Sequence, residues 1–287
     1  MPTQQVAVVT GTSSGFGKLT AETFASSGWR VFAGLRDVDS RNAEAADALR
    51  ERGITVVGLD VTDDASVAGA VRAVLDQAGA VDVLVNNAGI GAFGIQEAFT
   101  PAAVEQQFAV NVVGTLRVNR AFLPSMRERR SGLVVYMSSR LGRYVVPFMG
   151  LYCASKWAIE ALAEASSYEL APFGIDVAII EPAVYPTGLL AKDVGADDPE
   201  RVASYGDTAR FREALTGALQ SATEGRDPGD VAREVVRLAE LPAGERPLRT
   251  AMPATPAMDE NNAAVAAYQR QLLKSYGLQE LLPHAAR

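Results

Sequence analysis

A phenol and an amine stand four positions apart in the segment Tyr152-Cys153-Ala154-Ser155-Lys156. On an α-helix, residues four apart share a face, so Lys156 would lie beside the Tyr152 ring. A tyrosine hydroxyl titrates near ~10 in water, and a neighbouring cation lowers that pKa because it favours the phenolate. The pair therefore predicts Tyr152 as a general acid and base. The alternative interpretation is a solvated helix face, where pairs of this spacing are common.

A turn rich in glycine and serine follows the first predicted strand. Residues 5–10 have the apolar, β-branched composition of a buried strand, and residues 18–27 that of a helix. Between them the chain reads Thr10-Gly11-Thr12-Ser13-Ser14-Gly15-Phe16-Gly17. Glycine lets the backbone approach a ligand closely, and the N–H groups at the start of a helix attract anions. This arrangement predicts a phosphate-binding site.

Strands and helices alternate along most of the chain. The predicted strands are 30–35, 54–60, 81–86, 132–138 and 175–181, and the predicted helices are 39–52, 63–78, 101–129 and 152–173. Repeated β-α units predict an α/β protein: one Rossmann-type, doubly wound parallel sheet of about seven strands, with helices on both faces. Ligands of such sheets bind at the carboxyl ends of the strands, which is where the glycine turn falls.

The last hundred residues are less regular. Residues 183–229 contain several prolines and glycines and predict a substrate lid or, alternatively, a surface excursion with short helices. A helix at 230–241, a short strand at 248–252 and a helix at 263–282 follow, the last in a C-terminal extension of about 254–287. Tyr268, Leu272 and Tyr276 recur every four residues there, a stripe that most simply packs on the core and could instead meet another subunit. We expect residues 1–287 to form a single domain.

Composition excludes several classes of function. The chain has 287 residues, 48% of them hydrophobic and 21% charged, with a net charge of −7, which argues against a nucleic-acid groove. No apolar run reaches the ~18 residues of a membrane span, and the first residues do not resemble a signal peptide, so a cytoplasmic location is expected. The single cysteine, Cys153, fits a reducing compartment. The single histidine, His284, is close to the end, which argues against a histidine triad or a metal site.

Four motifs now stand in order along the predicted sheet: the glycine turn, Asn86-Asn87-Ala88-Gly89, the pair Ser138-Ser139, and Tyr152-x-x-x-Lys156. Together they resemble the short-chain dehydrogenase/reductase family over residues 5–190. The stretches 34–37 and 160–169 are similar to its hydroxysteroid and retinol dehydrogenase branch.

The resemblance implies a set of catalytic residues. Tyr152 would exchange a proton with the carbonyl or alcohol oxygen of the substrate, and Lys156 would lower the tyrosine pKa and bind the nicotinamide ribose. The family's spacing between serine and tyrosine selects Ser139 to orient the oxygen, with Ser138 as the alternative. Asn111, in the segment Phe108-Ala109-Val110-Asn111-Val112, would hold a water that relays protons to the lysine. Asn86 would mainly secure the sheet.

The resemblance also implies a nicotinamide cofactor. Arg36 follows Leu35 where relatives that bind NAD(H) have an acidic residue, so NADP(H) is favoured over NAD(H), since a guanidinium binds phosphate. Asp37 could pair with Arg36 and weaken this preference, and Ser14 stands where some relatives have a second basic residue. Ala183 replaces the usual glycine after Pro182. The cofactor-binding residues implied are Gly11, Ser13, Ser14, Gly15, Phe16, Gly17, Arg36, Asp60, Val61, Asn87, Ala88, Gly89, Tyr152, Lys156, Pro182, Val184 and Thr187.

The predicted substrate pocket is largely apolar and suits a bulky ketone, aldehyde or secondary alcohol. Its candidate residues are Phe93, Val145, Phe148, Met149, Tyr185 and Leu189. The expected function is NADP(H)-dependent interconversion of a carbonyl and an alcohol, with a catalytically idle NADP-binding regulator as the alternative. A methyltransferase and an extended-branch epimerase or dehydratase fit less well. The resemblance further implies a homodimer or homotetramer through the helices at 101–129 and 151–173.

Overall fold

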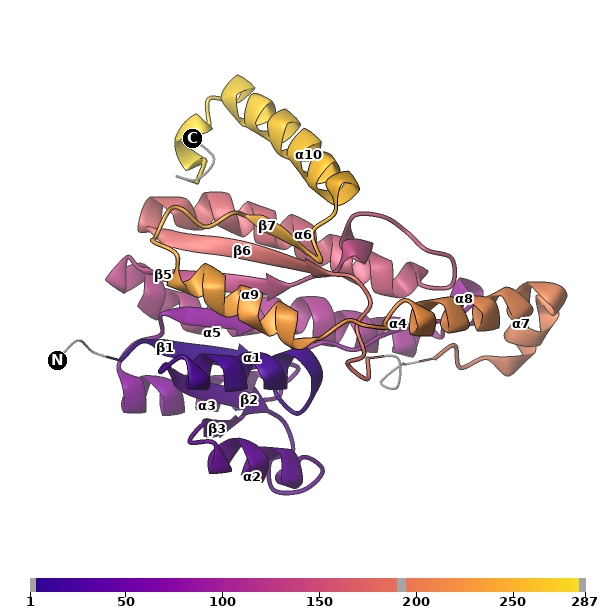
Figure 1. Cartoon of the computed structure of the whole chain (residues 1–287), viewed down its shortest axis with the longest axis horizontal. Helices are drawn as coiled ribbons and strands as arrows, with labels where there is room; N and C mark the ends of the chain where they lie inside the picture. Colours follow the sequence, from indigo (N-terminus) through magenta and orange to yellow (C-terminus); the bar gives the residue numbers. More distant parts are fainter. Residues whose placement is uncertain (1–3, 190–194, 284–287) are drawn as a thin grey trace.

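The central element is a sheet of parallel strands that run in the order β3-β2-β1-β4-β5-β6-β7 (Figure 1). The computed structural model describes residues 4–189 and 195–283. The strands are β1 (Val6–Thr10), β2 (Arg30–Leu35), β3 (Thr55–Gly58), β4 (Val83–Asn86), β5 (Gly132–Met137), β6 (Ile175–Pro182) and β7 (Arg249–Met252). The strand order reverses direction between β1 and β4, which opens a crevice at the carboxyl ends of these strands. The predicted fold class is confirmed.

Helices cover both faces of the sheet because both faces are apolar. In β1, Ala7 and Val9 pack on one face with α1 (Gly15–Ser26), α2 (Ala43–Glu51) and α9 (Gly229–Glu240). Val6 and Val8 pack on the other face with α3 (Asp64–Ala78), α5 (Gly114–Arg129) and α6 (Gly150–Leu170). Alternation along the strand sends neighbouring side chains to opposite sides. Figure 1 shows α1 and α9 in front of the strands.

The helix expected at 101–129 has the predicted ends but is not uniform. It consists of α4 (Pro101–Phe108), one π-helical turn, η2 (Ala109–Val113), and α5. Thr100 caps its start by accepting a hydrogen bond from the amide of Ala103 at 3.3 Å. Asn111 lies inside the π turn, and such turns occur frequently at functional sites.

The segment after β6 contains more regular structure than the sequence indicates. It forms α7 (Pro199–Ser204), the 3₁₀ turn η6 (Gly206–Ala209) and α8 (Arg210–Ser221), which extend beyond the carboxyl ends of the strands (Figure 1). Short 3₁₀ turns elsewhere are η1 (Gln96–Ala98), η3 (Arg140–Gly142), η4 (Ala171–Phe173) and η7 (Gln279–Leu281).

The last helix, α10 (Pro256–Ser275), begins earlier than predicted and lies beside β7, at the edge of the sheet (Figure 1). The sequence predicts that the stripe of Tyr268, Leu272 and Tyr276 packs on the core. This prediction is wrong for the two tyrosines, which are 65% and 67% exposed. The helix buries Met258 and Leu273 instead, and the two tyrosines face outward.

The sequence predicts neither a membrane span nor a metal site. None of the helices in residues 4–189 and 195–283 is both long and apolar enough to cross a bilayer. Within the same ranges, no group of three or more histidine, cysteine, aspartate or glutamate side chains is arranged to hold a metal ion. His284 lies outside the described residues.

Candidate active site

The glycine turn forms a cradle between the end of β1 and the start of α1. Gly11 and Gly15 have φ values of +70° and +58°, a region that favours glycine. A Cβ on Gly11 would lie 2.7 Å from the Cα of Ala88, so a side chain there would collide with main chain. Asn87 fixes the turn, because its Nδ2 donates to the carbonyl of Thr10 at 2.8 Å. The cradle thus lies at the N-terminal end of α1, the end of a helix that attracts a pyrophosphate.

Gly17 has a packing role in this cradle. It does not line the cavity described below, and a Cβ at this position would lie 2.3 Å from Nδ2 of Asn87 and 2.4 Å from the carbonyl oxygen of Gly11. Glycine at this position therefore permits the close approach of α1 to the turn.

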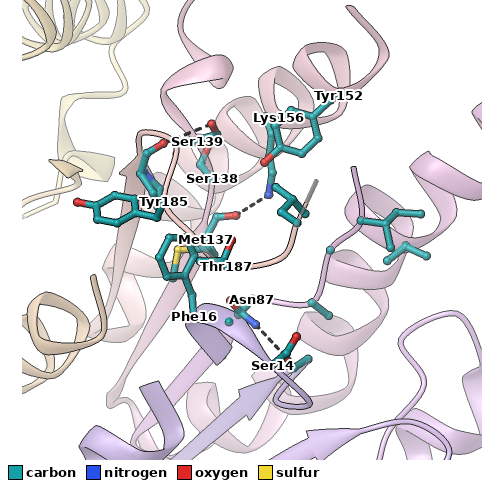
Figure 2. A pocket seen from close by; sticks show the side chains of 18 of the residues that line it. Ser14, Phe16, Asn87, Met137, Ser138, Ser139, Tyr152, Lys156, Tyr185 and Thr187 are labelled. Atoms are coloured by element: carbon teal, nitrogen blue, oxygen red, sulfur yellow. Dashed lines mark hydrogen bonds between the residues drawn. The ribbon is translucent and has the colours of Figure 1, made fainter. Parts of the chain in front are cut away.

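A single cavity of about 740 Å³ connects the glycine turn to Tyr152. Figure 2 shows Ser14 and Phe16 at one end, and Ser138, Ser139, Tyr152 and Lys156 at the other. Of the cofactor-binding residues predicted, the following line it: Gly11, Ser13, Ser14, Gly15, Phe16, Arg36, Asp60, Val61, Asn87, Ala88, Gly89, Tyr152, Lys156, Pro182, Val184 and Thr187. The predicted substrate pocket contributes Phe93, Met149, Tyr185 and Leu189 to the cavity lining, but not Val145 and Phe148. The predicted catalytic residue Asn111 does not line the cavity either.

The end of the cavity beside β2 carries two guanidinium groups. Arg36 and Arg41 both line it, and the sequence analysis missed Arg41 because nothing in the pattern shows that the loop after β2 folds back over the cavity. Asn42 closes this loop by donating to the carbonyl of Arg36 at 2.8 Å. The Nε of Arg36 lies 3.8 Å from Oδ2 of Asp37, a half-exposed pair that contributes little in water.

Asp60 faces the same end and remains ionised. Burial raises its pKa, but hydrogen bonds from the amide and hydroxyl of Thr62 and the charges of Arg36 and Arg117 outweigh burial, so the net pKa is lowered. The two Thr62 bonds measure 2.8 and 2.7 Å. A carboxylate at this position is available to accept a hydrogen bond from a ligand.

Ser139 and Tyr152 meet at the opposite end. Ser139 follows β5 and caps η3, accepting from the amide of Leu141 at 3.1 Å and donating to the carbonyl of Pro182 at 3.4 Å. Its hydroxyl also interacts with the phenol of Tyr152, an interaction that lowers the pKa of the phenol. The neighbouring Oγ of Ser138 has no hydrogen-bond partner within the described part of the chain, which agrees with Ser139 as the preferred serine.

The pKa of Tyr152 differs from the sequence prediction. Burial raises it well above its usual value, and the interaction with Ser139 offsets only part of this rise. The predicted lowering by Lys156 does not prevail, because Tyr152 is only 6% exposed and its phenolate would lose hydration. Burial also lowers the pKa of Lys156 to about 8, against a smaller opposing effect of the Glu160 charge.

Asn111 is bound on every side by protein groups. Its Oδ1 accepts from the amide of Ile90 at 2.9 Å, and its Nδ2 donates to the carbonyl of Ile90 at 3.0 Å and to Oγ of Ser155 at 3.1 Å. The side chain therefore joins the π turn of η2 to the segment after β4 and to α6. Asn86 donates to Asn119 at 2.8 Å, which secures the sheet to α5.

Apolar side chains surround Tyr152 on the side away from the glycine turn. Phe93 lies with its ring centre 5.7 Å from that of Tyr152, and Met149 and Cys153 belong to the same cluster. Leu215 and Leu219 of α8 pack against this cluster. The segment after β6 thus covers the site with leucines that the sequence analysis did not identify.

Comparisons with known proteins agree with this geometry. The model of the short chain dehydrogenase family matches residues 5–197. The 17-beta-hydroxysteroid dehydrogenase type 1 of Homo sapiens is 40% identical over 238 residues, which are 79% of this chain and 71% of that protein. Retinol dehydrogenase 8 of Bos taurus is 34% identical over 258 residues, 84% of this chain and 79% of that protein.

The likeness extends to solved structures. A short-chain dehydrogenase from Streptomyces avermitilis superposes with a TM-score of 0.76 at 31% identity, covering 96% of this chain and 97% of that one. Other matching structures hold NADP or NAD. With the motifs at the predicted strand ends and a family match over more than half of its length, this chain belongs to the short-chain dehydrogenase/reductase family of oxidoreductases.

Proposed function

We propose that this protein interconverts a bulky apolar ketone or aldehyde and the corresponding alcohol, with NADP(H) as its preferred cofactor. The observation that carries the proposal is the continuous cavity, which has guanidinium groups at one end and a phenol among apolar side chains at the other. Its relatives named as hydroxysteroid and retinol dehydrogenases support a substrate of this size and polarity.

The protein groups at the reacting end have separate roles in this proposal. A bound nicotinamide would supply or accept the hydride. In reduction, Tyr152 gives its proton to the carbonyl oxygen, and Ser139 donates a hydrogen bond that holds this oxygen in place. Lys156 stabilises the phenolate that remains, because its ammonium lies 5.7 Å from the centre of the ring. Asn111 joins η2 to Ile90 and to Ser155 of α6, and its proposed role in proton relay rests on the family resemblance alone.

The phosphate cradle and Arg36 fit the proposed cofactor. Glycines at positions 11 and 15 let the turn approach Ala88 and Thr187 more closely than a Cβ would allow, and Arg36 and Arg41 present two cations where an adenosine 2′-phosphate would lie. Matching structures contain NADP-type or NAD cofactors and therefore do not distinguish between them. The proposed preference for NADP(H) rests on Arg36 and Arg41.

We assign the segment 183–229, of which residues 190–194 lie outside the described part of the chain, as a substrate lid. Its helix α7 is fastened to η1 by Arg201, whose Nη1 lies 2.8 Å from Oε1 of Glu97, and by Tyr205, whose hydroxyl donates to Oε2 of Glu97 at 2.8 Å. Its helix α8 turns Leu215 and Leu219 toward the phenol. A lid of this kind excludes water from the reacting atoms and supplies an apolar wall to the substrate.

A homo-oligomer is also part of the proposal. Large apolar side chains are exposed along the helix that spans α4, η2 and α5 and on α6, namely Val104, Val113, Leu116 and Trp157. Contiguous exposed apolar groups mark interaction surfaces. The mass of the purified protein in solution tests this assignment.

The function is tested by oxidation of NADPH and NADH with a panel of ketones and aldehydes, from small polar compounds to steroid-sized apolar ones. The proposal expects turnover with NADPH that increases toward the bulky apolar members. Cofactor binding without turnover on any member would support the idle regulator instead. A preference for NADH would contradict the role given to Arg36.

A further inference from the structure

A buried ionic cluster lies behind the catalytic serine, where β6, β7 and α6 meet. At its centre, Nε of Arg249 lies 2.9 Å from Oε2 of Glu160 and 3.7 Å from Oε1 of Glu181. Its Nη2 donates to Glu164. The side chains of Arg249, Glu160 and Glu181 are 6%, 4% and 0% exposed. Charges buried to this extent are costly unless they are paired, so the cluster requires a fixed geometry.

The cluster is connected to the turn that carries Ser139. Arg143, the residue after η3, places its Nε 3.8 Å from Oε1 of Glu181. Glu181 directly precedes Pro182, whose carbonyl accepts the hydrogen bond from Ser139. Both ends of the η3 turn therefore depend on the last two residues of β6.

The turn also packs directly on the cluster. A Cβ on Gly142 would lie 2.8 Å from Cγ of Glu160 and 2.9 Å from Oγ of Ser138. Because no atoms fit between them, a displacement of the cluster has to move the turn.

The chain beyond β7 reaches this region at two points. Nδ2 of Asn262, on α10, donates to Oε2 of Glu181 at 2.6 Å. A guanidinium nitrogen of Arg140, in η3, donates to the carbonyl of Pro253. Both partners lie outside residues 5–197, the part that matches the family model. Apart from these contacts α10 buries few side chains, Met258 and Leu273 among them.

We infer that the segment 253–262 is a positioning element for Ser139: Asn262 fixes Glu181, Glu181 and the Pro253 carbonyl fix the η3 turn, and the turn fixes the serine hydroxyl. This inference rests on the proposed function, in which Ser139 orients the substrate oxygen. Asn262 does not line the active-site cavity. Its replacement should therefore alter the position of the Ser139 hydroxyl and leave the affinity for the cofactor unchanged.

The test compares Asn262→Asp with Asn261→Asp. Both variants replace an amide with a carboxyl group on the same helix, but Asn261 is exposed, whereas an aspartate at 262 replaces the Nδ2 donor that faces Oε2 of Glu181 with a second carboxyl oxygen. We expect Asn262→Asp to lower kcat for ketone reduction by about 10- to 100-fold, since small misplacements of a catalytic group have effects of this size. The Kd for NADP⁺ should change less than about twofold, and Asn261→Asp should behave as wild type.

A second readout does not depend on turnover. Amide hydrogen exchange of residues 139–143, measured well below the unfolding temperature of both variants, should accelerate in Asn262→Asp and not in Asn261→Asp. Equal kcat values and equal exchange in the two variants would overturn the inference. If Ser139→Ala also retained full turnover, the proposed function itself would fail; if Ser139→Ala lost turnover while Asn262→Asp did not, only the inference would fail.

Discussion

The ammonium of Lys156 lies 5.7 Å from the centre of the Tyr152 ring and donates to the carbonyl of Met137 at 2.8 Å. This hydrogen bond joins α6 to the end of β5, so the lysine fixes the distance between the phenol and the serine turn. Because burial raises the pKa of Tyr152 and lowers that of Lys156 to about 8, the phenol stays protonated through neutral pH. Tyr152 therefore holds the proton that it gives to the carbonyl oxygen in the proposed reduction.

The first prediction concerns the pH dependence of reduction. Below pH 8 Lys156 is charged and stabilises the developing phenolate; as the pH rises through its pKa of about 8, the charge is lost and kcat should fall. The rate is measured with saturating NADPH between about pH 6 and 10. Lys156→Arg keeps a charge that does not titrate in this range, so its residual activity should not fall near pH 8. A decrease in kcat near pH 8 that persisted in Lys156→Arg would show that another group titrates there.

The second prediction concerns cofactor preference. Arg36→Leu should raise KM for NADPH by about 10- to 100-fold, because charge-assisted hydrogen bonds to phosphate are among the stronger ones, and should leave KM for NADH nearly unchanged. Arg41→Leu should have a smaller effect of the same sign. Arg50→Leu is the control, since Arg50 lies on α2, pairs with Asp47 and does not line the cavity. Equal increases of KM for both cofactors would contradict a phosphate-specific role.

The third prediction concerns the lid. Glu97→Gln keeps the shape of the side chain but removes the charge that binds Arg201 and Tyr205, so the lid should open more readily. KM for bulky apolar substrates should rise by about two- to fivefold, the size expected for exposed ion pairs, while KM for the cofactor stays constant. Glu200→Gln, an exposed residue of α7, is the matched control. An unchanged KM in Glu97→Gln would show that the contacts of Glu97 with Arg201 and Tyr205 do not restrain the lid.

The fourth prediction concerns stability and Glu181. Burial, followed by the charge of Glu160, raises the pKa of Glu181 to about 7, against the opposing effects of Asn262, Arg249 and Arg143. Between the ordinary value of 4.5 and 7, the unfolded chain releases this proton and the folded chain retains it. The contribution of Glu181 to stability is therefore lost as the pH rises through this window.

Chemical denaturation of Glu181→Gln measures this effect. The free energy of unfolding of the variant minus that of the wild type should increase from pH 4.5 to 7 and then level off, by about 2–3 kcal/mol at most. Glu164→Gln, on the outer side of the same cluster, should not reproduce this pH dependence. A difference that stayed constant or decreased over the window would contradict the assignment.

The parts of the site that the sequence predicts are those fixed by local rules. A strand followed by a glycine turn and a helix places Gly11 and Gly15 at the sheet edge, and helical spacing places Lys156 beside Tyr152. Buried strands of β-branched residues predict the parallel sheet for the same reason. These features depend on neighbours within a few positions.

The remaining features depend on contacts between distant segments. Arg41 lines the cavity because of the path of a loop, and Leu215 and Leu219 pack against the apolar cluster that contains Tyr152 only through the docking of α8. The raised pKa of Tyr152 follows from burial that distant residues create, so the local pairing with Lys156 gives the wrong sign. Asn262 and Glu181 form a hydrogen bond although they are 81 positions apart in the chain, and no sequence pattern predicts such a pairing.

Tyr152 is the proposed proton donor in a nicotinamide-dependent reduction. The most direct test is the single-turnover rate of Tyr152→Phe with saturating NADPH and the best ketone of the panel. The variant keeps the ring that packs against Phe93 and removes only the hydroxyl. We expect a decrease of about 10²- to 10⁴-fold with cofactor affinity retained; an undiminished rate would show that Tyr152 is not the proton donor.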